Sequence, residues 1–178
     1  LIMKQFLAII FFLFSSSIFS QDDPQSEFFL AENYFREGDY EKATQIYKKL
    51  YDVSQFNTTY LYKLISCYQQ TESFETAENL LLNRLKKDPS QTYLHVLIGN
   101  NYSKLQKENL AEIEFQKALK SIENNSPYAT TIAQIFNDYN LLKYAILAYK
   151  KAMEKNPSSN FNFQIAQIYG EQGDYKKM

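Results

Sequence analysis

One spacing of 34 residues runs through this chain of 178 residues and constrains its fold more than any other feature. Residues of matching type return at this step in separate columns of the sequence. The three clearest columns are aromatic, alanine, and aromatic or leucine: Tyr34, Tyr68, Tyr102 and Phe136; Ala43, Ala77, Ala111 and Ala145; Tyr47, Leu81, Phe115 and Tyr149. Such a period predicts an array of similar structural units rather than one irregular core.

Within one unit the apolar residues have the spacing of helix faces. Two sets share it: Leu30, Ala31 and Tyr34 in a first helix, and Ala43, Tyr47 and Leu50 in a second. One such helix pair cannot bury its apolar side alone, whereas stacked pairs can. The chain has only four Gly and four Pro, too few for a turn-dense β-sandwich. The sequence therefore predicts an all-α chain.

These columns resemble the tetratricopeptide repeat (TPR), a 34-residue helix–turn–helix unit. The resemblance implies an α-solenoid of TPR units in a right-handed superhelix, with a concave groove lined by the first helices. Pro89 and Pro157 occupy the late proline position of the repeat and are expected to end second helices. The resemblance covers residues 24–178, as units 24–57, 58–91, 92–125 and 126–158 and a partial unit 159–178.

Some positions depart from the repeat pattern. The turn Gly38-Asp39-Tyr40 returns as Gly173-Asp174-Tyr175 after 135 residues, one short of four periods, which predicts a deletion near Ser158-Ser159. Glu72-Ser73 and Gln106-Lys107 replace the Gly-Asp turn in the second and third units. Arg84 lies in a column otherwise held by Leu or Ala, and it is expected to extend to solvent.

The TPR resemblance also implies which residues line the groove. TPR adaptors that grip a peptide carboxylate use Lys and Asn at such positions, and here only Asn100 and Lys104 match, so that clamp is expected to be absent or crippled. The remaining side chains suit hydrogen bonding to an extended backbone, with Tyr62 and Tyr93 packing on side chains. A solvated concave face without a ligand is the alternative. The predicted partner-binding residues are Tyr62, Ser66, Gln69, Tyr93, Asn100, Lys104, Gln134 and Asn137.

Residues 1–20 have the layout of a secretory signal peptide. Lys4 supplies the positive start, and the apolar run from Phe6 to Phe14 ends in serines. That run is about half the roughly 20 residues needed to span a membrane. Cleavage after Ser20 is expected, and retention of the segment as an anchor is the alternative. The chain is therefore predicted to be exported, to the periplasm or the cell envelope.

The composition leaves little room for catalysis. A single Cys and a single His cannot form an internal disulfide or a Cys/His zinc site, and no Gly-rich phosphate loop is present. Cys67 and His95 are expected to be packing residues, and acids such as Glu112 and Glu114 to lie on solvated helix faces. A net charge of −1 gives no footprint for nucleic acid. No enzyme activity, cofactor or metal is predicted.

The function predicted from the sequence is a non-enzymatic scaffold that binds a protein or peptide partner. The alternative is the N-terminal docking or sensory part of a longer membrane-linked signalling or cell-wall-associated protein. Since Met178 follows the turn of the fifth unit by only three residues, the natural product is expected to continue. Membrane insertion of the mature segment is not expected, and the sequence leaves the oligomeric state open.

Overall fold

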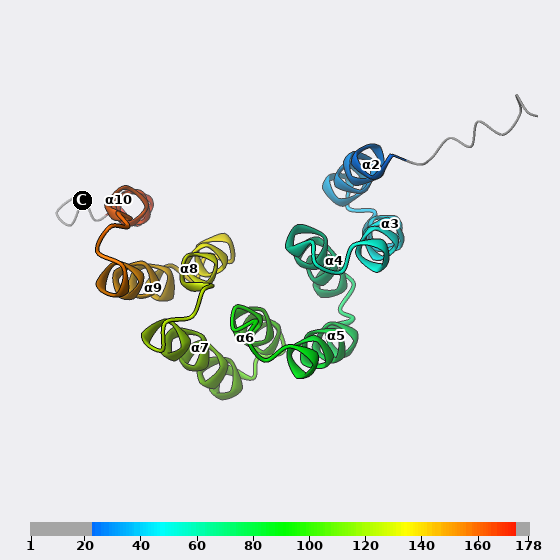
Figure 1. Cartoon of the computed structure of the whole chain (residues 1–178). Helices are drawn as coiled ribbons and strands as arrows, with labels where there is room; N and C mark the ends of the chain where they lie inside the picture. The colour runs from blue at the N-terminus through cyan, green and yellow to red at the C-terminus, as the bar shows by residue number, and fades with distance from the viewer. Residues whose placement is uncertain (1–22, 174–178) are drawn as a thin grey trace, which may run out of the picture. The chain divides into compact units, whose positions relative to one another are not determined.

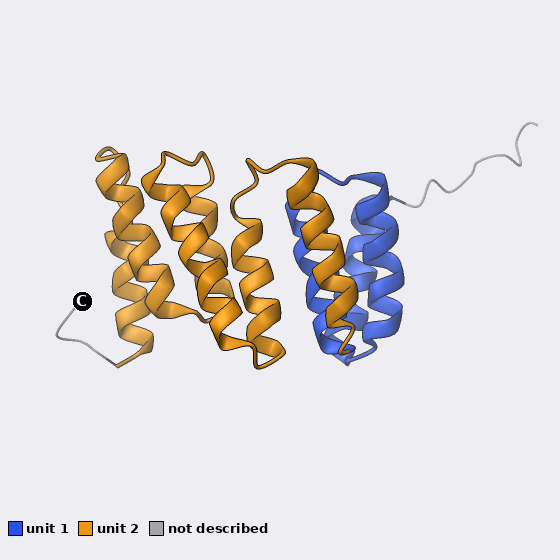
Figure 2. Cartoon of the chain, turned by 90° about the horizontal axis from the view of Figure 1, so that it is seen from below, with its two compact units in different colours: residues 1–71 blue, residues 72–178 orange. Residues whose placement is uncertain are grey.

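The computed structural model describes residues 23–173 of the chain. The predicted signal peptide and the Asp174-Tyr175 part of the last turn lie outside these residues. All regular secondary structure in the described range is α-helical, as the repeat predicted (Figure 1). The chain divides into two compact units, residues 1–71 and residues 72–178, which are coloured separately in Figure 2. We describe each unit by itself.

Unit 1 contains three helices whose ends are set by local side chains. Asp23 caps the first helix by accepting hydrogen bonds from the backbone N–H groups of Gln25 and Ser26, at 3.3 and 3.2 Å. Gly38 ends that helix at φ 81°, a left-handed conformation that glycine adopts without steric cost. Asp39 then caps the next helix at Lys42 N. The helices are α2 (Pro24–Glu37), α3 (Tyr40–Val53) and α4 (Thr58–Gln70).

The core of unit 1 forms where these helices meet. The alanine and aromatic columns supply Ala43 and Tyr47 of α3, both without exposed surface. Opposite them, α4 buries Leu61, Ile65 and Cys67 completely. The prediction that Cys67 packs as a small apolar residue is confirmed. Its burial raises the pKa of the thiol to about 11, so the thiolate is scarce at neutral pH.

Unit 2 contains six helices in two rows. Figure 1 shows α6, α8 and α10 in one row and α5, α7 and α9 in the other, as expected for alternating first and second helices of a repeat. The prolines act as predicted, since α5 and α9 each end two residues before Pro89 and Pro157. The helices are α5 (Phe74–Lys87), α6 (Leu94–Lys104), α7 (Glu108–Glu123), α8 (Ala129–Asp138), α9 (Leu142–Lys155) and α10 (Asn162–Glu171).

Aromatic rings fill the space between the helix pairs of unit 2. Phe115 of α7 lies 5.5 Å from Phe136 of α8 and 4.9 Å from Tyr144 of α9, measured between ring centroids. Gly99 of α6 is required beneath this cluster, because a Cβ atom there would lie 2.4 Å from Cε1 of Phe115. The alanine column remains buried, with Ala111 at 1% and Ala145 at 0% exposure.

The turn backbone is retained where the turn sequence is not. Glu72 and Gln106 replace glycine, and both have positive φ, at a cost of about 1 kcal/mol or more for an L-residue. The deletion lies between Asn140 and Gly173, the interval that contains Ser158-Ser159, because only this step is 33 residues. The positive-φ turn residues are Gly38, Glu72, Gln106, Asn140 and Gly173, at 81°, 55°, 59°, 56° and 71°.

Candidate functional site

The predicted groove residues divide between the two units. In unit 1, Tyr62, Ser66 and Gln69 lie on α4 at i, i+4 and i+7 and share one face, and all three are half-buried. The neighbouring Lys63 forms an ion pair with Glu32 of α2, with 2.7 Å between Nζ and Oε1. The prediction that the three α4 residues contact a partner stays a prediction.

In unit 2 the predicted residues differ in accessibility. Lys104 and Gln134 are exposed, and Asn137 is half-buried. Asn100 is only 4% exposed and Tyr93 only 1%. The expectation that Tyr93 stacks on a partner is not met in this conformation, because its ring packs edge-on against Tyr128 at 5.0 Å and is covered.

Arg84 explains why Tyr93 is held inside. Rather than extending to solvent as expected, Arg84 donates from Nε to Oε1 of Gln91 at 2.7 Å and from Nη2 to the Tyr93 hydroxyl at 3.4 Å. The Tyr93 hydroxyl donates to the same Gln91 oxygen at 2.9 Å, and the Gln91 amide donates to Asp88 at 2.8 Å. The replacement of an apolar residue by Arg84 is therefore compensated by a bonded cluster between α5 and the start of α6.

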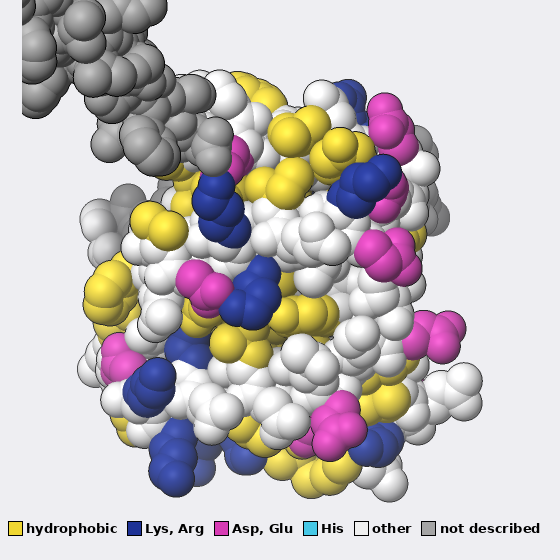
Figure 3. Space-filling view, turned by 90° about the vertical axis from the view of Figure 1, so that its right-hand side faces the viewer, with side chains coloured by type: hydrophobic (Ala, Val, Ile, Leu, Met, Phe, Trp, Pro, Cys, Tyr) yellow, Lys and Arg dark blue, Asp and Glu magenta, His cyan; other side chains and the backbone are white. Residues whose placement is uncertain are grey.

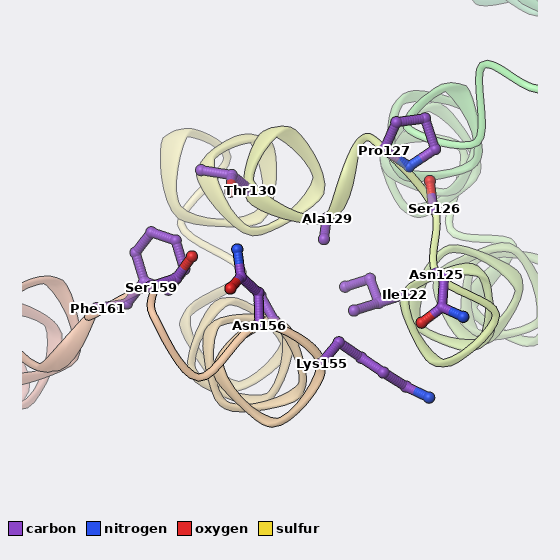
Figure 4. Close-up of a pocket in the computed structure, with 11 residues that line it drawn as sticks. Ile122, Asn125, Ser126, Pro127, Ala129, Thr130, Lys155, Asn156, Ser159 and Phe161 are labelled. Atoms are coloured by element: carbon purple, nitrogen blue, oxygen red, sulfur yellow. The ribbon is translucent and has the colours of Figure 1, made fainter.

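A pocket of about 290 Å³ lies at the N-terminal end of α8 (Figure 4). Ile122 of α7 and Asn156 after α9 point into it, whereas Lys155 extends away from its centre. Phe161 forms one wall and is held by the Tyr149 ring at 5.2 Å. Lys155 is the one charged residue in the lining, which comprises Ile122, Asn125, Ser126, Pro127, Ala129, Thr130, Ala152, Lys155, Asn156, Ser159 and Phe161.

One face of α8 continues from this pocket. Thr130, Gln134 and Asn137 lie at i, i+4 and i+7, so they form a single row along the helix, which we name the α8 strip. Thr130 lines the pocket, and Thr130 and Gln134 are exposed. The strip spans seven residues, or roughly 10 Å at a rise of about 1.5 Å per residue. All three side chains are uncharged and can donate and accept hydrogen bonds.

The pocket was not predicted from the sequence, although two of its features could have indicated it. It is formed largely by the loops between repeat units, on which the column analysis has no information. One of these loops contains the predicted deletion at Ser158-Ser159, and the other turns at Asn125, whose φ is 62°. Departures from the period were therefore the available signal.

His95 is half-buried and packs as predicted, but it also forms a specific contact. Its Nδ1 lies 2.6 Å from Oε2 of Glu114, and Lys117 lies 2.5 Å from the other carboxylate oxygen. Burial alone would raise the pKa of Glu114, yet the hydrogen bonds from His95 and Lys117 outweigh it and hold this pKa below its ordinary value. The expectation that Glu114 lies on a solvated face is wrong, because this pairing draws it toward α6.

Other chemistry finds little support in the described part of the chain. Within residues 23–173, no three His, Cys, Asp or Glu side chains are grouped closely enough to hold a metal ion. None of the helices in that range is sufficiently long and apolar to span a membrane. On the face in Figure 3, cationic and acidic side chains are interspersed with apolar ones, so this face carries no field of a single sign.

Comparison with known proteins agrees with this architecture. The family model "Tetratricopeptide repeat" matches residues 92–125, the range expected for the third unit. The model "Anaphase-promoting complex, cyclosome, subunit 3" matches residues 10–84. The chain belongs to the TPR family. Its fold is an all-α TPR solenoid, while the hand of the superhelix and the unit boundaries stay predictions.

Several relatives share this fold. The TPR repeat-containing protein MJ1428 of Methanocaldococcus jannaschii is 29% identical over 150 residues, covering 83% of this chain. The TPR chain spans about a quarter of that relative's length, 26%. PcrH, solved in complex with the chaperone binding region of PopB, has a TM-score of 0.50 at 18% identity and covers 68% of this chain and 98% of its own. The TPR protein TTC0263 of Thermus thermophilus has a TM-score of 0.49 at 20% identity, covering 84% and 82%.

Proposed function

We propose that this TPR chain is a non-enzymatic scaffold that binds an extended segment of a protein partner along the α8 strip. The observation that carries the proposal is the continuity between an apolar-floored pocket and an uncharged, hydrogen-bonding helix face in unit 2. The pocket can accept one apolar side chain against Phe161 and Ile122. The strip can then hydrogen-bond the backbone that follows.

The dimensions support an extended ligand. A strand advances about 3.3 Å per residue, so three residues span the roughly 10 Å from Thr130 to Asn137. Asn125, Thr130 and Ser159 add amide and hydroxyl groups at the mouth of the pocket. A ligand of this type gains affinity from backbone hydrogen bonds and specificity from the pocket.

The family membership supports binding rather than catalysis. TPR proteins generally act as scaffolds, and the PcrH structure with its PopB segment is a TPR protein bound to part of another protein. The pKa of Cys67 is raised by burial, which disfavours a nucleophilic role. His95 is occupied by Glu114 and lies away from the pocket lining.

We also propose that the chain acts outside the cytoplasm, in the periplasm or at the cell envelope, on the basis of the signal-peptide layout of residues 1–20. The alternative is that it is the docking part of a longer membrane-linked protein. A fusion of residues 1–30 to a reporter that is active only after export tests the location. Reporter activity is expected, and its absence would contradict export.

A random 12-residue peptide library displayed on phage, selected against the full chain, tests the binding function. We expect enriched peptides to compete with one another, and to bind at least about tenfold more weakly to Thr130→Arg and Gln134→Arg variants. Asn109→Arg on α7 is the matched control, because Asn109 is exposed and is not in the pocket lining or the strip. No enrichment, or equal loss with the control, would contradict the proposal.

A further inference from the structure

Unit 2 buries two kinds of side-chain amide. At its α5–α6 end, Asn101 is fully buried and donates from Nδ2 to the carbonyl oxygen of Phe74 at 3.0 Å. Gln91 is 8% exposed, and its oxygen accepts hydrogen bonds from both Arg84 and Tyr93. These amides are part of the fold, since their polar atoms are satisfied by the protein itself.

The amides on the other first helices of unit 2 differ. Oδ1 of Asn137 on α8 and Oε1 of Gln164 on α10 are buried, and neither receives a hydrogen bond from any residue in the described range. An unsatisfied buried acceptor destabilises a fold, because its hydration is lost without replacement. Native proteins retain few such groups, and each of them calls for an explanation.

The repeat register shows what the two amides replace. Lys63 and Gln164 each precede their turn residue, Glu72 or Gly173, by nine positions. In unit 1, Lys63 forms an ion pair with Glu32 at 2.7 Å and lies 5.7 Å from the Phe35 ring. By the same count from Gly38 and Asn140, the equivalents of Glu32 and Phe35 are Gln134 and Asn137. A charged, internally paired set in unit 1 is therefore replaced in unit 2 by three neutral amides.

These amides belong to the surface already proposed to bind. Asn137 is the last residue of the α8 strip, and Gln164 occupies α10, the next helix of the same row in Figure 1. Both buried atoms are acceptors, so they require donors. The backbone N–H groups of an extended segment are such donors, whereas a terminal carboxylate is not.

We propose that the side-chain oxygens of Asn137 and Gln164 accept hydrogen bonds from backbone N–H groups of an internal, extended segment of the partner. This inference rests on the proposed peptide-binding function and adds the partner's chemistry to it. The segment is recognised through its main chain at this end of the strip. A free C-terminal carboxylate is disfavoured, because its oxygens would face two acceptors.

The test uses a peptide enriched in the phage selection, synthesised with a blocked C-terminal amide. Each backbone nitrogen is methylated in turn, which removes one N–H donor at a time, and the affinity for the full chain is measured by calorimetry. At one or two positions, methylation is expected to weaken binding by about tenfold, or about 1.4 kcal/mol. With Asn137→Leu or Gln164→Leu, the unmethylated peptide should bind correspondingly more weakly, and methylation at the partner position should cost nothing further.

Thermal melts keep this test independent of folding. Asn137→Leu removes an unsatisfied acceptor, so the variant should melt at or above the temperature of the parent chain while losing affinity. Asn101→Leu is the matched control, because it breaks an existing hydrogen bond and should melt at a lower temperature.

The possible failures are distinguishable. If peptides are enriched but Asn137→Leu and Gln164→Leu bind every methylated form like the parent chain, this inference is overturned and the scaffold function stands. That result is also the one expected if bound water satisfies the two oxygens. If no peptide is enriched, the scaffold function fails, and the inference fails with it.

Discussion

The α2–α3 pair of unit 1 and the α6–α7 pair of unit 2 have the same helix–turn–helix plan but are stabilised differently. The α2–α3 pair has strong local signals, with Asp23 and Asp39 as caps and Gly38 in the turn, while α2 itself buries only Ala31. The α6–α7 pair has no side-chain cap hydrogen bond at either helix start. Helix α6 instead buries seven residues, from Leu94 to Asn101.

This difference shows that the repeat can be specified by local sequence or by packing. Where the turn residue is glycine and the caps are acidic, the backbone geometry needs little support from neighbours. In α6–α7, packing around Phe115 compensates for a strained turn at Gln106. Substitutions should therefore have their largest effects through packing in α6–α7 and through capping in α2–α3.

The largest effect is expected at Gly99. Gly99→Ala places a methyl group 2.4 Å from the Phe115 ring, so the ring must move within a packed cluster. Overpacking of this kind costs about 1–3 kcal/mol of unfolding free energy, which outweighs the gain in helix propensity. Urea unfolding followed by circular dichroism measures the loss. Adding Phe115→Leu should reduce the further cost below the sum of the two single changes, and strict additivity would contradict the steric explanation.

Loss of a cap in the other pair should have a smaller effect. Asp23→Ala removes the acceptor for the N–H groups of Gln25 and Ser26 and should cost about 1 kcal/mol, with fraying of α2. Hydrogen exchange of the first α2 amides checks this expectation. Asp23→Asn is the control, since it retains a capping oxygen and should protect these amides nearly as well as Asp. Equal exchange in the Ala variant would contradict the capping role.

Correction of the strained turn should make the two pairs more alike. Gln106→Gly relieves a side chain held at φ 59° and should stabilise the chain by about 0.5–1 kcal/mol, because the strain relieved exceeds the entropy lost by glycine. The reverse change, Gly38→Gln, should destabilise by a similar amount. Urea midpoints of the two variants provide the comparison, and a Gln106→Gly variant less stable than the parent would contradict the strain.

The smallest effect is a pH dependence in α6–α7. Because the folded-state pKa of Glu114 is below its ordinary value, its contribution is present above the unfolded-state pKa and is lost as the pH falls through the folded-state value. Glu114→Gln should therefore flatten the decline of stability between neutral and strongly acid pH. Glu75→Gln on α5 is the control, since Glu75 is exposed. Identical pH profiles for the parent and Glu114→Gln would exclude the role of this pair.

The period predicted the helices and most of the core, because both depend on residues that repeat. Ala43, Ala145 and Phe136 are buried where the columns place them. The positive φ at Glu72 was not predictable from propensity, since the turn is imposed by the packing of the helices it joins.

The site was less predictable than the fold. Gln134 and Asn137 come from the TPR resemblance, but Tyr93 is removed from the accessible surface by its cluster with Arg84 and Gln91. That cluster depends on side chains meeting across α5 and α6, which no column encodes. Gln164 was missed because an unsatisfied oxygen is visible only in three dimensions.

The most direct test of the central claim is nuclear magnetic resonance of the isotope-labelled full chain titrated with an enriched peptide. The claim is that an extended segment binds from the pocket along the α8 strip. We expect the largest shift changes at the amides of Thr130, Gln134, Asn137 and Gln164, with the outer faces of α7 and α9 unchanged. Changes confined to those outer faces, or to the α2–α3 pair, would contradict the account.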